Sequence, residues 1–236
     1  MGAIAAAVQA CRTRIETACA KAGRPVHCAR LLAVSKTFPD SAIREAHACG
    51  LTAFGESYLQ EAQAKLDALA DLPLEWHFIG PLQSNKTRPV AERFAWVHGV
   101  EREKIARRLS EQRPTALPPL NVCIQVNVSG EASKHGVAPE PALDLARLVA
   151  GLPGLLLRGF MAIPEASPDS GLQRARFSLL RSLLEQARSA GLAVDTLSMG
   201  MSADLEAAIL EGSTMVRVGS AIFGARNTRQ DTEAQT

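Results

Sequence analysis

The feature that most constrains the fold of this 236-residue chain is a regular alternation of short apolar, β-prone runs with longer helical patterns. The helical patterns often end at a glycine, which is favoured just after a helix C-terminus. Strands that alternate with helices pair in parallel, so eight such units predict a single α/β domain, a (β/α)8 TIM barrel. An extra helix at residues 3–22 precedes it. The predicted strands cover residues 31–35, 51–54, 74–79, 95–98, 120–127, 155–161, 194–198 and 214–218.

An open, doubly wound sheet is the alternative architecture. It would place a glycine fingerprint or a P-loop directly after the first strand. The first predicted strand is instead followed by "SKTFPDS", which matches neither motif. No repeat or linker interrupts the pattern, so we expect one barrel domain over residues 1–226 and a polar tail over residues 227–236.

Composition argues against several classes of partner. A formal charge of +2 and 4% aromatic residues do not favour a nucleic-acid surface. No apolar run reaches the 18 or so residues of a membrane span. Five scattered cysteines and five histidines show no zinc-ligand spacing, so we expect no metal site and free thiols in a reducing cytoplasm.

Polar and glycine residues collect where the predicted strands end, which is the catalytic face of a barrel. Lys36 follows the first strand, Ser57 follows the second, and Arg217 lies inside the last. For Lys36 the choice is between an ammonium that points into solvent and an amine that does chemistry. Arg217 must donate to a partner, either a carboxylate such as Glu56 or Glu75 across the barrel, or a ligand atom.

A phosphate site is expected after the seventh and eighth strands, where barrels often bind this group. "GMS" (200–202) opens a helix after the seventh strand, and "GSAIFG" (219–224) offers glycine and a hydroxyl after the eighth. The alternative is that Gly219 makes a turn and Ser220 caps a helix. His77, between Trp76 and Phe78, is expected to be a hydrogen-bonded core residue, with a cofactor contact as the second interpretation.

Six motifs occur in order along the chain: "AVSKTFP", "FGESYLQEAQAK", "EWHFIGPLQSNK", "VNVSGEASKHGV", "GFMAIP" and "LSMGMSADLEAAILEGSTMVRVGSAIFGAR". With these motifs the chain resembles the pyridoxal 5′-phosphate (PLP) homeostasis proteins, a family related to the N-terminal barrel of alanine racemase. The resemblance extends from the leading helix to about residue 226. It implies that PLP is bound as an internal aldimine on Lys36.

The same resemblance implies a role for each remaining site residue. Ser202, Gly219 and Ser220 would contact the phosphate, Met199 and Gly200 would lie beside the cofactor, and Arg217 would face the pyridine nitrogen. Ser57 stands where the family usually has asparagine, and the shorter side chain leaves room for a water in place of that contact. The roles of the rim lysines Lys86 and Lys134 stay open.

The leading hypothesis is reversible storage and delivery of PLP in the cytoplasm, with PLP-dependent apo-enzymes as candidate recipients. We expect the protein to be a monomer. A PLP-dependent amino-acid racemase is the first alternative. It needs an acid/base group on each face of the α-carbon, and Tyr58, the single tyrosine of the chain, does not match the racemase position. A Schiff-base or phosphate-binding barrel enzyme without PLP is the second alternative.

Overall fold

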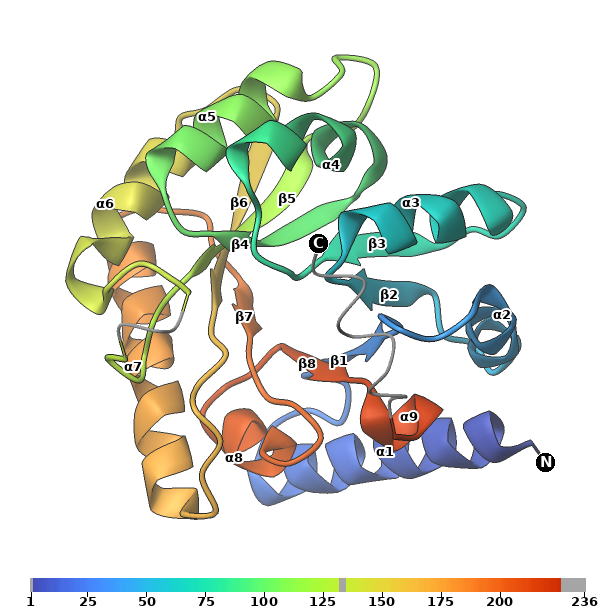
Figure 1. Ribbon diagram of the computed structural model, residues 1–236. Coiled ribbons are helices and arrows are strands. Elements are labelled where there is room, and N and C mark those ends of the chain that lie inside the picture. The colour runs from blue at the N-terminus through green and yellow to red at the C-terminus, as the bar shows by residue number, and fades with distance from the viewer. Residues whose placement is uncertain (1, 132–134, 226–236) are drawn as a thin grey trace.

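The computed structural model describes residues 2–131 and 135–225, and these form a closed eight-stranded barrel. Every strand pairs in parallel with its sequence neighbours, and β8 returns to β1, so the predicted TIM barrel is confirmed (Figure 1). The strands are β1 (Arg30–Val34), β2 (Ala53–Glu56), β3 (Glu75–Phe78), β4 (Trp96–Val100), β5 (Leu120–Gln125), β6 (Leu155–Met161), β7 (Thr196–Ser198) and β8 (Met215–Val218).

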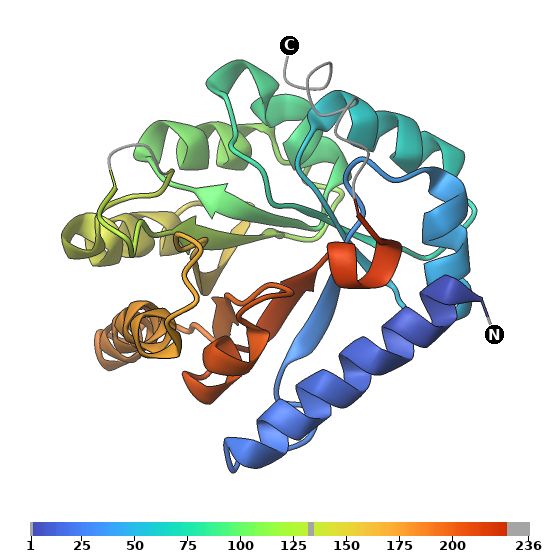
Figure 2. The same cartoon turned by 60° about the horizontal axis from the view of Figure 1, so that its bottom comes forward.

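Helices surround the barrel, as the alternating pattern requires (Figure 2). They are α1 (Ala3–Lys21), α2 (Asp40–Ala48), α3 (Leu59–Ala68), the 3-10 turn η1 (Ser84–Lys86), α4 (Thr87–Arg93), α5 (Glu103–Gln112), α6 (Pro139–Ala150), α7 (Ser170–Ser189), α8 (Leu205–Leu210) and α9 (Ser220–Phe223). The predicted extra helix is α1, which packs along α8 and α9. The expected polar tail and Lys134 lie outside the described residues.

Several expected boundaries differ from those of the structure, and two of them concern the rim of the barrel. The second strand ends at Glu56, not before Gly55, because Lys65 pairs with the buried Glu56 carboxylate and lets the strand continue through it. The helix after β7 begins at Leu205 and not within "GMS". The Asp204 carboxylate accepts a hydrogen bond from the Met201 N–H, which closes a turn ahead of the helix.

Helix α4, which contains Pro89, was not expected from the sequence. Proline is tolerated there because it lies in the first turn, where the missing N–H has no intrahelical partner.

The barrel separates two apolar cores. Alternate strand residues point inward and form a small interior cluster that includes Leu32, Trp96, Cys123 and Met161. The intervening residues face outward and pack beneath the helices in a much larger core. The interior also accepts polar side chains, so a strand residue that reads as polar can still be fully buried.

The five cysteines are all free, and the thiols of Cys19 and Cys28 lie 2.9 Å apart. In the described ranges, no helix is long and apolar enough to cross a membrane. The same ranges contain no group of three or more His, Cys, Asp or Glu side chains arranged to hold a metal ion.

Candidate functional site

The carboxyl ends of β7, β8, β1 and β2 are consecutive around the barrel, and they bring most of the predicted site residues to one stretch of its rim. Lys36 lies two residues beyond β1 and is half-buried. Its Nζ atom is 5.7 Å from the centre of the Tyr58 ring, which follows β2. Ser57 lies directly between β2 and Tyr58, so it belongs to the same part of the rim.

The loop after β1 also packs against α9. The rings of Phe38 and Phe223 lie 5.1 Å apart. A Cβ atom on Gly219 would lie 3.1 Å from the Val34 carbonyl oxygen, so glycine allows the chain after β8 to pass close to the end of β1. Lys36 therefore lies beside the start of α9.

A pair of hydroxyls lies at the start of α9. Ser220, the first residue of α9, donates to the Oγ atom of Ser202 over 3.4 Å. Both side chains come from the loops where the sequence predicts a phosphate site. Hydroxyl donors beside glycine backbone suit an anion.

Residues after β7 are joined to β8 by backbone hydrogen bonds. The Met199 N–H donates to the Met215 carbonyl, and the Arg217 N–H donates to the Gly200 carbonyl over 2.9 Å. Gly200 has φ +95°, and a Cβ there would lie 2.6 Å from Cβ of Ala208. The buried Met199 and Gly200 are therefore held beside Arg217.

Arg217 is 3% exposed and donates to neutral oxygens. Its Nη1 donates to the backbone oxygen and the Oγ atom of Ser198, and its Nη2 donates to the Ala162 carbonyl over 2.7 Å. The expectation that Glu56 or Glu75 pairs with Arg217 is wrong, because these carboxylates bind Lys65 and Arg30 respectively. Burial lowers the pKa of Arg217 to about 10, so the guanidinium remains charged at neutral pH.

His77 is fully buried, and both of its ring nitrogens have partners. Nε2 lies 2.7 Å from the Glu75 carboxylate, and Nδ1 lies 2.9 Å from Nε2 of His98. This arrangement agrees with the hydrogen-bonded core residue that the sequence predicts. Its imidazole partner, His98, was not singled out from the sequence, although it shares the inward face of β4 with Trp96.

A buried ionic network that contacts both chain neighbours of Lys36 was also not predicted from the sequence. Lys65 of α3 donates to the Ser35 carbonyl, to Glu56 over 2.9 Å and to Glu61. Glu56 is fully buried, and its Oε2 atom has no hydrogen-bond partner among the residues that the structure describes. Burial raises the pKa of Glu56 to about 7, against the opposing effects of Lys65 and the Ser35 hydroxyl. The signal in the sequence was the Glu61–Lys65 pair at i,i+4 spacing on α3.

The same network holds the backbone next to Lys36. The Thr37 N–H donates to Glu61 over 2.6 Å, and Thr37 has φ +68°, a left-handed conformation that is uncommon for a β-branched residue. Such strain persists where surrounding contacts enforce it, and it is frequent at functional sites. The network therefore fixes the turn that carries Lys36.

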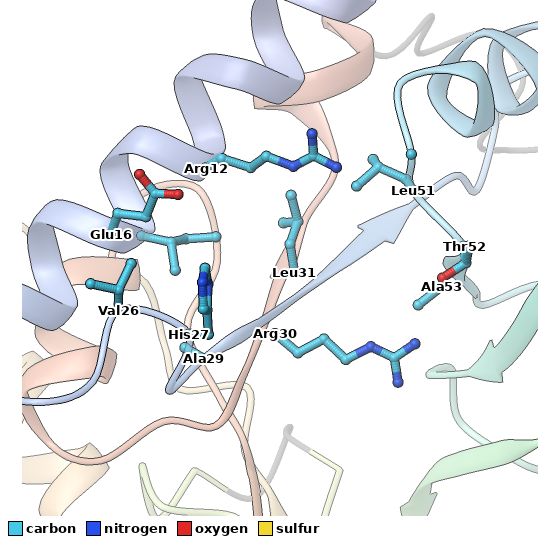
Figure 3. Close-up of a pocket in the computed structure, with 12 residues that line it drawn as sticks. Arg12, Glu16, Val26, His27, Ala29, Arg30, Leu31, Leu51, Thr52 and Ala53 are labelled. Carbon is cyan, nitrogen blue, oxygen red and sulfur yellow. The ribbon is translucent and has the colours of Figure 1, made fainter.

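A cavity of about 270 Å³ lies at the opposite end of the barrel, where β1 and β2 begin. Figure 3 shows Arg12 of α1 and Arg30 of β1 at its edges. The Arg30 guanidinium forms an ion pair with the Glu75 carboxylate over 2.7 Å. The cavity is therefore separate from the rim that carries Lys36.

Comparison with known proteins finds related sequences. Residues 7–227 match the family described as alanine racemase, N-terminal domain. A Pseudomonas aeruginosa protein named pyridoxal phosphate homeostasis protein is 61% identical over 227 residues, which cover 96% of this chain and 97% of that protein.

Solved structures agree as well. The structure of PipY from Synechococcus elongatus with PLP bound is 33% identical and has a TM-score of 0.82, with 94% of this chain and 100% of that chain covered. An alanine racemase from Corynebacterium glutamicum has a TM-score of 0.72 at 20% identity, over 94% of this chain and 61% of that one. This last likeness concerns the fold alone.

Proposed function

Because the chain belongs to the family of pyridoxal phosphate homeostasis proteins, within the wider alanine racemase N-terminal domain family, we propose that it stores and delivers PLP through a reversible covalent bond to Lys36. The observation that carries the proposal is the position of Lys36. Its amine lies near Tyr58 on the loop that packs against α9, and the strand next to β1 is β8, which carries the buried Arg217.

The side chains present fit the chemical groups of PLP. An amine matches the aldehyde, and Ser202, Gly219 and Ser220 match the phosphate. Arg217 can only donate, which matches an unprotonated pyridine nitrogen. The glycine at 219 leaves the space that a Cβ would fill near β1. Met199 and Gly200 would line the cofactor on the β7 side, and Ser57 with Tyr58 would border it on the β2 side.

Each residue then has a definite task. Lys36 would hold the cofactor through its amine, a group that condenses reversibly with an aldehyde and releases one water. Bound PLP supplies an aldehyde and an electron-withdrawing ring. The permanent charge of Arg217 disfavours a proton on the ring nitrogen, which weakens the ring as an electron sink. Retention of the cofactor is therefore favoured over carbanion chemistry.

We place the PLP-binding barrel at residues 1–226, as a monomer that works in the cytoplasm. PLP-dependent apo-enzymes would receive the cofactor. A reversible bond to one lysine suits this role, because a recipient with its own lysine can accept the aldehyde once water has released it.

Amino-acid racemisation is the second candidate, and the 5.7 Å approach of Tyr58 to Lys36 favours it. Two acid/base side chains at one site are the minimum that racemisation requires. The two functions differ in how fast the protein exchanges the α-proton of an amino acid.

We expect the PLP-loaded protein to exchange the α-proton of L-alanine slowly in D2O. The rate should be at least 100-fold below the turnover numbers of typical enzymes, which are roughly 1–10³ s⁻¹. Proton NMR of the alanine signal measures the rate, with free PLP as the control. The Tyr58→Phe variant should exchange at the wild-type rate. Exchange at catalytic rates that Tyr58→Phe reduces would replace the storage proposal with a racemase.

The phosphate cradle gives a separate prediction. The double variant Ser202→Ala, Ser220→Ala should bind PLP roughly tenfold or more weakly, because hydrogen bonds to a charged group are lost. Pyridoxal, which has no phosphate, should bind the variant and the wild type within about threefold of each other. Fluorescence or absorption titration with both ligands measures this. Ser178→Ala on α7 is the matched control. An equal loss for both ligands would show that the hydroxyls do not act on the phosphate.

A further inference from the structure

A chain of hydrogen bonds crosses the barrel interior and ends on Arg217. It runs from Glu75 to His77 (2.7 Å), then to His98 (2.9 Å) and to the Ser198 hydroxyl (2.8 Å), which accepts from Arg217 over 2.8 Å. We call Glu75, His77, His98 and Ser198 the imidazole chain.

The imidazole chain links strands that are not neighbours. His98 lies on β4 and Ser198 on β7, so their hydrogen bond spans the interior of the barrel and is not part of its wall. His77, His98 and Ser198 are each fully buried, and Arg217 is 3% exposed. Because buried polar atoms must find partners, the position of every proton along the chain is constrained by its neighbours.

The two ends fix the direction of the donors. Arg217 has donors and no acceptor, so the Ser198 oxygen must accept from it. At the other end, Glu75 is held ionised. The hydrogen bond from His77, with help from Arg30, lowers the pKa of Glu75 to about 2. The carboxylate can only accept, so Nε2 of His77 must carry a proton.

The two end groups determine which nitrogens of His77 and His98 carry a proton. A neutral His77 with its proton on Nε2 must accept at Nδ1, so Nε2 of His98 donates to it. His98 in turn accepts at Nδ1, and the Ser198 hydroxyl donates there. Every group makes its full set of bonds with both imidazoles neutral.

The opposite arrangement, in which the donors point from Glu75 toward Arg217, would require a charged imidazole. If Nδ1 of His98 donated to Ser198, Nδ1 of His77 would have to donate to His98. His77 would then be protonated on both nitrogens, because Nε2 still faces the Glu75 carboxylate. Burial lowers the pKa values of both His77 and His98, and Arg217 adds to the effect at His98. A charged imidazole is therefore strongly disfavoured here.

We propose that the imidazole chain is a positioning device of fixed polarity, in which every donor points from Arg217 toward Glu75 and the Ser198 oxygen is thereby directed at the Arg217 guanidinium. His77, His98 and Ser198 are positioning residues that act on the ligand through Arg217. The consequence for PLP retention rests on the function proposed above, whereas the polarity of the chain does not.

The polarity is tested on the wild-type protein alone. Nitrogen-15 NMR of the full-length, histidine-labelled protein, with and without PLP, distinguishes protonated from unprotonated ring nitrogens. We expect His77 and His98 to be neutral, with the proton on Nε2, from pH 6 to pH 9. A proton on Nδ1 of either residue, or an imidazolium in that range, overturns the proposal whether or not the protein binds PLP.

The positioning role is tested with Ser198→Ala, which removes the hydroxyl but leaves Arg217 its bonds to two backbone carbonyls. PLP should leave the variant roughly three- to tenfold faster, with a shifted visible absorption band and a shifted Nδ1 signal of His98. Thr87→Val, which removes a buried hydroxyl on α4, is the control and should change none of these. Release and absorption equal to those of the control overturn the positioning role.

Discussion

The Lys36→Ala variant is expected to lose all covalently retained PLP. Wild-type protein incubated with PLP and treated with borohydride should carry roughly one reduced pyridoxyl group per chain, and the variant less than about one tenth of that. The physical reason is that the Lys36 amine lies at the rim near Tyr58, on the loop that packs against α9, and α9 begins with Ser220. Mass spectrometry of the intact protein measures the label, and the visible absorption band should vanish with it.

Lys104→Ala on the exposed surface of α5 is the matched control, and it should keep the label of the wild type. Peptide mapping should place the wild-type label on Lys36. A label of undiminished size in Lys36→Ala, or a map that assigns it to another lysine, would contradict the site. A wild-type protein that takes up no label at all would contradict PLP binding itself.

The Lys65→Met variant is expected to lose about 3–5 kcal/mol of unfolding free energy at pH 8, the usual cost of removing one partner from a buried ion pair. Lys65 is 6% exposed, and its ammonium contacts Glu56, Glu61 and the Ser35 carbonyl. Methionine fills the volume of the stem but leaves the buried Glu56 carboxylate without its cation. Urea denaturation measures the loss.

The loss should depend on pH in a definite direction. In the folded wild type the pKa of Glu56 is already raised from 4.5 to about 7, so the folded protein binds this proton more tightly than the unfolded chain does. Without Lys65 the pKa rises further. Between pH 4.5 and about 7 both proteins are penalised alike, because the unfolded chain releases the proton and each folded state retains it. Above pH 7 the folded wild type ionises Glu56 beside Lys65, whereas the folded variant still retains the proton and is penalised further. The destabilisation should be clearly smaller at pH 5 than at pH 8.

Lys104→Met makes the same chemical change on an exposed helix and should alter stability by less than about 0.5 kcal/mol. A Lys65→Met protein with the same loss at pH 5 and pH 8 would mean that packing, not the Glu56 charge, accounts for the cost.

The sequence predicted the architecture well because strand and helix periodicities are local. All eight strands were found within two residues of their ends, and one of the differences arises where a polar residue continues a strand. Glu56 is the example, since a glutamate read as the start of a loop is the last residue of β2. Only the distant Lys65 makes a carboxylate acceptable there.

The positions of the candidate site residues were predictable where a motif places them after a strand. Lys36, Ser202 and Ser220 follow β1, β7 and β8, and barrel closure brings those ends together. The partners of Arg217 were not predictable. A guanidinium requires acceptors, but the sequence cannot distinguish a carboxylate from a serine and a backbone carbonyl on neighbouring strands.

The sequence by itself therefore determined the barrel, its order of elements and the lysine at the end of β1, because these follow from periodicity and from position along one strand. Tertiary structure alone decided which buried polar groups meet. His98 and Ser198 are separated by 100 residues and lie on opposite sides of the interior, yet their hydrogen bond sets the surroundings of Arg217. Such contacts depend on the closure of the barrel and on which side chains face inward across it. A local sequence pattern cannot predict them, because the residues are far apart in the chain.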